Sequence, residues 1–123
     1  MLLNDSHFKV LCDGMKKCPS LVSINVSNND ITHHGLKKMV PVTQNLDIEE
    51  FVLSNNKLGD PGVHLLFEIL SKRRCKLVFL DISNCQLKCE GFLLVLKAIA
   101  TGNKSSLKNL KMDGNNLNSF NRD

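Results

Sequence analysis

Few residues of this 123-residue chain have the types and spacing that chemistry requires. The adjacent pair His33 and His34 could bind a metal ion through imidazole, but neighbouring loop histidines point apart and no cysteine or carboxylate lies at ligand spacing. Cys85 and Cys89 are better explained as a repeat-position residue and a loop thiol. The chain has no P-loop, nucleophile elbow or dinucleotide-binding fingerprint. The sequence therefore nominates no catalytic residue, metal site or cofactor.

A basic cluster, the basic ridge, is formed by Lys72, Arg73 and Arg74. Cations at the end of a helix complement its dipole and bind its last carbonyls, which favours a capping role over a phosphate or acidic-partner site. The formal net charge of +4 is mild, and no aromatic residues alternate with the basic ones. We therefore predict a solvated basic face, with no binding of nucleic acid.

The composition indicates one folded domain, with 42% hydrophobic and 23% charged residues. The N-terminus lacks the features of a signal peptide, and no apolar run approaches the length of a membrane span. The five cysteines are odd in number and include no CxxC pair, which favours reduced thiols. We expect a cytoplasmic protein, with nuclear or cytoskeletal locations as alternatives, and no membrane partner.

The sequence contains an internal repeat, which predicts the elements that hold these residues. The pattern LxxLxLxx[N/C]xL occurs four times: LVSINVSNNDI at 21–31, IEEFVLSNNKL at 48–58, LVFLDISNCQL at 77–87 and LKNLKMDGNNL at 107–117. The spacings between these segments are 27, 29 and 30 residues. In each of the three complete units a glycine follows the pattern by four residues, at Gly35, Gly62 and Gly91. We divide the single domain 1–123 into a partial unit 1–20, units 21–47, 48–76 and 77–106, and a partial unit 107–123.

Beyond each glycine the apolar period changes from that of a strand to that of a helix. Apolar stripes with i, i+3, i+4, i+7 spacing follow: Leu36, Met39, Val40 and Thr43; Val63, Leu66, Phe67 and Leu70; Phe92, Val95, Leu96 and Ile99; and, near the N-terminus, Phe8, Leu11, Cys12 and Met15. Asp60 and Pro61 are typical of an N-cap and a first helical residue. Each unit is therefore expected to be a short strand followed by a helix.

These repeats resemble the leucine-rich repeat family in its ribonuclease-inhibitor-like subclass. Asparagine occupies the ninth position of the pattern in three of the four repeats, which is more similar to Ran GTPase-activating, tropomodulin-like or capping-protein-regulating members than to the inhibitor. The resemblance implies an α/β fold, a short right-handed solenoid with a parallel sheet on its concave face and helices on its convex face.

The ninth position lies where the chain leaves the sheet and its backbone groups lose their strand partners. A side-chain amide both donates and accepts, so it can satisfy the turning backbone. We therefore expect a structural ladder of Asn29, Asn56, Cys85 and Asn115. The preceding asparagines are expected to point outward and to be dispensable: Asn28, Asn55 and Asn84.

A partner is expected on the concave face, since repeat solenoids use this surface for docking. Its innermost column is Asn25, Val52, Asp81 and Lys111, flanked by Ser27, Ser54, Ser83 and Asp113 on one side and Ser23, Glu50, Phe79 and Asn109 on the other. The expected partner-binding residues are Asn25, Glu50, Val52, Phe79, Asp81 and Lys111. Phe79 is interpreted as an exposed aromatic anchor.

The sequence thus predicts a non-enzymatic protein-protein interaction module and a segment of a larger repeat protein. One alternative is a regulator of a partner enzyme, such as an activator of a small GTPase. Another is a structural segment of a cytoskeletal or ciliary assembly. Both ends lack a capping unit, so partial exposure of Phe8, Leu11, Leu110 and Met112 is expected, together with further repeats or end-to-end self-association.

Overall fold

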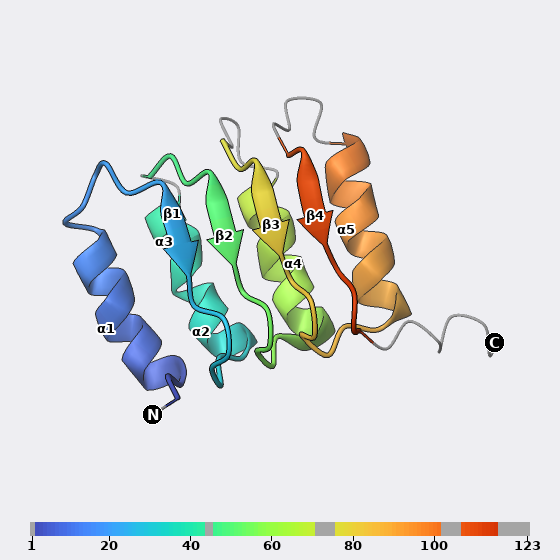
Figure 1. The fold of residues 1–123 in the computed structure, drawn as a ribbon, viewed down its shortest axis with the longest axis horizontal. Coiled ribbons are helices and arrows are strands. Elements are labelled where there is room, and N and C mark those ends of the chain that lie inside the picture. The colour runs from blue at the N-terminus through green and yellow to red at the C-terminus, as the bar shows by residue number, and fades with distance from the viewer. Residues whose placement is uncertain (1, 44–45, 71–75, 102–106, 116–123) are drawn as a thin grey trace.

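The computed structural model describes residues 2–43, 46–70, 76–101 and 107–115 (Figure 1). The four strands stand in one row with the helices on one side, and helical segments separate the strands along the chain (Figure 1). In chain order the elements are α1 (Asp5–Met15), β1 (Ser23–Asn25), α2 (His33–Lys37), α3 (Met39–Thr43), β2 (Glu50–Val52), α4 (Gly59–Leu70), β3 (Phe79–Asp81), α5 (Cys89–Thr101) and β4 (Asn109–Lys111).

The strands form one parallel sheet in the order β1-β2-β3-β4. The register aligns the repeats residue by residue, so that Ile24, Phe51, Leu80 and Leu110 occupy one row. This row faces the helices, while the residues on either side of it face away from them. The α/β repeat solenoid expected from the sequence is therefore confirmed, with an open sheet.

The core is a continuous aliphatic cluster between sheet and helices, with Phe51 fully buried near its centre. The expectation that Phe8 would be uncovered is wrong. Phe8 is fully buried because α1 packs against both α2 and α3. Met112 is also mostly buried, whereas Leu110 is half-buried and Leu11 is exposed, as expected.

The helical segment of unit 21–47 is broken at Lys38 into α2 and α3. Pro41 has no N–H to donate to the carbonyl four residues earlier, that of Lys37, and its ring would clash with that carbonyl in a continuous helix. The buried face shifts with the break, so that Val42 is buried and Val40 is only half-buried. Leu36, Met39 and Thr43 of the predicted stripe are buried and Val40 packs against the core, so the stripe is confirmed, with Val42 buried in addition.

The helix of unit 48–76 begins at Gly59, earlier than predicted, and Asp60 lies inside its first turn instead of capping it. The Lys88 N–H donates to Asp60 Oδ1 (2.9 Å), so this carboxylate stabilises the next unit. Asp5 occupies the same place in the first unit, and its carboxylate accepts from the N–H and hydroxyl of Thr32.

The recurring glycines lie against these carboxylates. A Cβ atom on Gly35 would collide with Asp5 Oδ1, and one on Gly91 would collide with Asp60 Oδ1. In the remaining unit a Cβ on Gly62 would lie 2.8 Å from Leu58 Cβ. Gly35 and Gly91 therefore permit close stacking of one unit on the next, whereas Gly62 avoids a collision within its own unit.

One residue of the predicted stripes lies elsewhere than expected, because Leu96 is exposed while Ala98 is buried. Phe67 is half-buried and packs against the core, and Ile69 is buried in addition.

Candidate protein-interaction face

Asn56 shows how one side chain joins two repeats. Its Nδ2 donates to Leu53 O and to Val26 O, both at 2.9 Å, while the Ile31 N–H donates to its Oδ1 at 3.0 Å. Leu53 belongs to its own unit, but Val26 and Ile31 belong to the preceding one. The buried amide therefore satisfies the turning backbone of both units at once.

Asn115 makes the same set of bonds one level further along the solenoid. Its Nδ2 donates to Met112 O (2.7 Å) and Ile82 O (3.0 Å), and its Oδ1 accepts from Cys85 N and Leu87 N, both at 2.9 Å. At the first level, Asn29 Oδ1 accepts from Leu3 N at 2.8 Å. All three amides thus bond to the backbone of the preceding unit.

Cys85 replaces the amide in unit 77–106. Its Sγ donates to Leu53 O (3.1 Å), which reproduces the bond that the amide donates to the preceding unit. Sulfur is a weak acceptor, so the thiol is a poor replacement for the amide oxygen. Burial raises the pKa of Cys85 to about 11, despite backbone hydrogen bonds that lower it. The neutral thiol is therefore the form that fits this position.

The outward-pointing neighbours have a role that the sequence reading missed. Asn28, Asn55 and Asn84 are exposed as expected, but their φ angles are 61°, 60° and 52°, in the left-handed region. Gly114 holds the equivalent place in the last repeat with φ 74°. Asparagine and glycine are the residues that tolerate this conformation best. The sequence signal for a left-handed backbone was therefore that this position holds only Asn or Gly in the four repeats.

The concave face carries the side chains that were expected to bind a partner. The register places Glu50 beside Phe79, and Val52 beside Asp81. Asn25 and Lys111 continue the second row at its two ends. All six partner-binding candidates named from the sequence therefore lie on one surface.

Two of these polar side chains also hold their own strand ends. The Ser27 N–H and hydroxyl donate to Asn25 Oδ1 (3.1 and 2.7 Å), and the Ser83 N–H donates to Asp81 Oδ1 (3.0 Å). An alanine at position 81 would therefore remove a backbone partner as well as a charge. Val52 at the equivalent place cannot form this bond.

Acidic groups gather on this face although the chain as a whole is basic. Ser83 is almost fully buried and lies between two of them, because its hydroxyl also donates to Asp113 Oδ1 (3.1 Å). Glu50 adds a third carboxylate, which accepts from the Ser23 hydroxyl (3.1 Å). The first residues of the four strands form one row on this face and the last residues form another, and we call these the central rows. Lys111 is the one basic side chain in them.

Phe79 and Val52 supply the apolar part of the concave face. Both are half-buried, so Phe79 is not the freely exposed aromatic that was expected. A ring that is partly supported by its neighbours loses less conformational freedom on binding than a free one. The pair is therefore a small, rigid apolar spot next to carboxylates.

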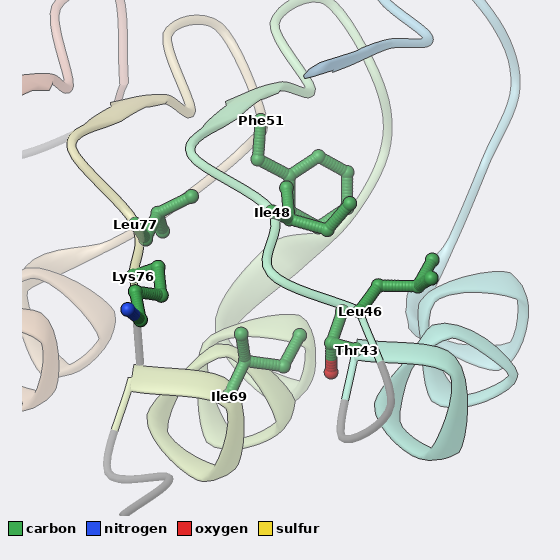
Figure 2. A pocket seen from close by; sticks show the side chains of 7 residues that line it. All are labelled: Thr43, Leu46, Ile48, Phe51, Ile69, Lys76 and Leu77. Carbon is green, nitrogen blue, oxygen red and sulfur yellow. The ribbon is translucent and has the colours of Figure 1, made fainter. Parts of the chain in front are cut away.

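Two hollows away from the concave face are small. Figure 2 shows one beneath Phe51, lined by Ile48, Ile69 and Leu77, with a volume of about 10 Å³, no more than one water molecule needs. Another, of about 200 Å³, lies between α4 and α5 beside Asp60 and Glu90. Among the described residues, no three His, Cys, Asp or Glu side chains are grouped to hold a metal ion.

The basic ridge of Lys72, Arg73 and Arg74 lies outside the described residues. Within the described ranges, no helix is both long and apolar enough to cross a bilayer.

Comparison with known proteins agrees with the geometry. A family model described as a leucine-rich repeat matches residues 17–40 and 44–67. The chain carries leucine-rich repeats of the ribonuclease-inhibitor-like kind. Mouse ribonuclease inhibitor is 29% identical over 118 residues, and the pig protein is 33% identical over 120 residues.

A second group of relatives has a different architecture around similar repeats. The rat NACHT, LRR and PYD domains-containing protein 3 is 34% identical over 118 residues. Each of these matches covers 94% of this chain, but only 25% of the inhibitors and 11% of the rat protein. The chain thus spans a quarter or less of the length of these relatives.

Proposed function

We propose that this leucine-rich repeat chain is a non-enzymatic module that binds another protein through its concave face. The observation that carries the proposal is the grouping of Phe79 and Val52 with the carboxylates of Glu50 and Asp81 on the open side of the sheet. Apolar contact supplies affinity, and the charges supply orientation and a faster encounter. The partner that fits is a protein surface with basic groups around an apolar side chain.

The relatives support the same class of function. Ribonuclease inhibitor acts, by its name, on a ribonuclease, which is a protein. The proposal for this chain extends only to the kind of interaction and leaves the partner to experiment.

The first experiment measures binding to a partner obtained by affinity capture and mass spectrometry. We expect Phe79→Ala to weaken the complex at least tenfold, because truncating a central aromatic commonly costs 2 kcal/mol or more. Asp81→Asn is the matched polar change: it removes the charge but keeps an oxygen that accepts from the Ser83 N–H. We expect this variant to bind more slowly and with less dependence on salt.

Lys57→Ala is the control, since Lys57 is exposed and pairs with Asp30 away from the central rows. Equal affinities for the wild type, Phe79→Ala and Asp81→Asn would exclude the concave face and make the basic ridge the next surface to test. Stimulation of GTP hydrolysis by a captured GTPase would favour the regulatory alternative instead.

A further inference from the structure

The turn at Leu58 and Gly59, in unit 48–76, lacks a hydrogen bond that the other units form. In those units the residue at the eleventh position of the pattern donates its N–H to the ladder amide of the following unit. These bonds run from Leu3 to Asn29 (2.8 Å), from Ile31 to Asn56 (3.0 Å) and from Leu87 to Asn115 (2.9 Å). Leu58 holds this position, but the next ladder residue is Cys85, which has no side-chain oxygen. Among the described residues, no group accepts from the buried Leu58 N–H.

Gly59 lacks a second bond for a similar reason. In two other units the equivalent residue donates its N–H, at 2.9 Å, to an aspartate of the unit before it, as Thr32 does to Asp5 and Lys88 does to Asp60. In unit 21–47 the residue at the place of these aspartates is His33, which has no carboxylate. Both side-chain oxygens that the other turns use are therefore missing at this one turn.

The peptide group between Cys85 and Gln86 is turned over in comparison with its counterparts. In the two earlier units the residue after the ladder asparagine donates its N–H to the preceding unit, as Asp30 does to Leu3 O (2.8 Å) and Lys57 does to Ile31 O (2.9 Å). Here Cys85 O instead accepts from the Gly59 N–H (2.9 Å). This peptide group thus presents its carbonyl to the preceding unit, where the others present their N–H.

Two residues with a left-handed backbone accompany the reversed peptide group. The φ angle is 63° at Gly59 and 61° at Gln86. Asn4 and Thr32, which hold the place of Gly59 in the earlier units, have φ angles of −113° and −105°. Among the described non-glycine residues, Gln86 alone has a positive φ without being asparagine. Glutamine is not a residue that adopts this conformation routinely, so its strain needs a cause.

We propose that His33 and Cys85 together act as a conformational switch for this turn. Because neither side chain offers an oxygen, the Gly59 N–H donates to Cys85 O, and this bond holds the peptide group reversed and Gln86 left-handed. A carboxylate at position 33 would accept from the Gly59 N–H, and an amide at position 85 would accept from the Leu58 N–H. With both oxygens supplied, the peptide group returns to the orientation found in the earlier units.

Glycine and alanine at residue 86 report the orientation of the peptide group. Glycine is favoured where φ is positive, whereas alanine is favoured where φ is negative, because glycine loses more conformational freedom on folding. We therefore expect Gln86→Gly to unfold at a higher urea concentration than Gln86→Ala. Lys57 is the matched control, since it holds the same place with the peptide group not reversed. Lys57→Gly should unfold at a lower urea concentration than Lys57→Ala.

Supplying both oxygens should reverse the order of the two variants at residue 86. In a protein that carries His33→Asp and Cys85→Asn, we expect Gln86→Gly to unfold at a lower urea concentration than Gln86→Ala, as at Lys57. An unchanged order in that background, with native circular dichroism, would overturn the proposal. Where this background does not fold, the comparison of residues 86 and 57 in the otherwise wild-type chain decides: alanine favoured at both would overturn it.

Amide hydrogen exchange, followed by nuclear magnetic resonance, tests the missing acceptor in the wild type. The Leu58 N–H should exchange about tenfold faster than those of Ile31 and Leu87, which hold the same place and donate to an amide oxygen. Cys85→Asn should slow exchange at Leu58 and leave Ile31 unchanged. Equal protection of Leu58 and Ile31 in the wild type would mean that this turn has an acceptor of its own, and the proposal would fail.

Discussion

At the scale of single residues, Asn55 and Asn56 show that adjacent and identical side chains can serve different physical needs. Asn56 is buried and bonds to backbone groups of two units. Asn55 is exposed, adopts a left-handed backbone and donates through Nδ2 to Asn28 Oδ1 (2.7 Å). One residue stabilises through its amide, and the other mainly through the backbone conformation that it tolerates.

Asn56→Ala is expected to lower the free energy of unfolding by about 1–3 kcal/mol, because buried backbone groups lose their partner. Asn55→Ala should cost about 1–2 kcal/mol for a different reason, since alanine pays the steric cost of the left-handed region. Urea unfolding followed by circular dichroism measures both values.

Glycine distinguishes the two causes. Asn55→Gly should be within a few tenths of a kcal/mol of the wild type, because glycine adopts positive φ freely, whereas Asn56→Gly should be at least as harmful as Asn56→Ala. Large and equal losses for both glycine variants would contradict the assignment.

Cysteine accessibility gives a second prediction at this scale. Burial raises the pKa of Cys12 and of Cys85 to about 11, so at pH 8 both remain thiols and lack the nucleophilic thiolate. Cys18 is exposed. Iodoacetamide at pH 8 should therefore label Cys18 first, and label Cys12 and Cys85 only after urea is added, as peptide mass spectrometry would show. Rapid labelling of Cys85 in the native protein would mean that its level of the ladder opens readily.

At the scale of elements, Asp5 links the start of α1 to the start of α2. Burial opposes ionisation of Asp5, but hydrogen bonds from Thr32 and Gly35, together with the nearby charge of His34, hold the pKa of its carboxyl below the ordinary value of 3.8. A lowered folded-state pKa contributes stability above the unfolded pKa, and this stability is lost as the pH falls through the folded value.

Asp5→Asn should therefore be less stable than the wild type at pH 7, and the difference should shrink as the pH is lowered from about 4 toward 2. Urea midpoints across this range measure the effect. Asp47→Asn, at an exposed aspartate, is the control and should show no such convergence. A constant difference for Asp5→Asn at all pH values would indicate lost packing in place of lost charge.

The element boundaries show where local sequence was sufficient and where it was not. The strands and the glycines could be placed from the repeat alone, because each unit imposes the same pattern on its neighbours. The break before Pro41 could have been predicted from the missing N–H, but the apolar spacing suggested one helix. The role of Asp60 could not have been predicted from its own unit, since its partner, the Lys88 N–H, belongs to the next unit.

The candidate site divides in the same way. Alternation along the strands predicted which side chains share the concave face, including Glu50 and Phe79. It could not predict that Asn25 and Asp81 bind the backbone two residues ahead, because those bonds depend on the turn that follows each strand. It also did not predict that Phe79 is half-buried.

At the scale of the whole molecule, the core is one continuous cluster, and Phe51 is central to it. Phe51→Ala should lower the free energy of unfolding by about 3–5 kcal/mol through lost burial and a new cavity. This is a large part of the stability of a typical domain, so partial unfolding at room temperature is expected. Phe51→Leu, which keeps more volume, should stay folded and lose less. Calorimetry on both variants would measure this, and a small loss for Phe51→Ala would show that the two halves of the sheet are stable independently.

The lengths of the units indicate which insertions and deletions in the gene the fold can tolerate. Gly35, Gly62 and Gly91 each lie fourteen residues after the first leucine or isoleucine of their unit, so all the variation among spacings of 27, 29 and 30 residues falls after the glycine. Strand, ladder and turn form a segment of fixed length, whereas the segment that returns to the sheet can gain or lose residues. Deletions and insertions in the gene are thus tolerable in one half of each repeat and disruptive in the other. A duplication of one whole repeat would reproduce the segment of fixed length and the strand register, which gives such a gene a simple way to grow.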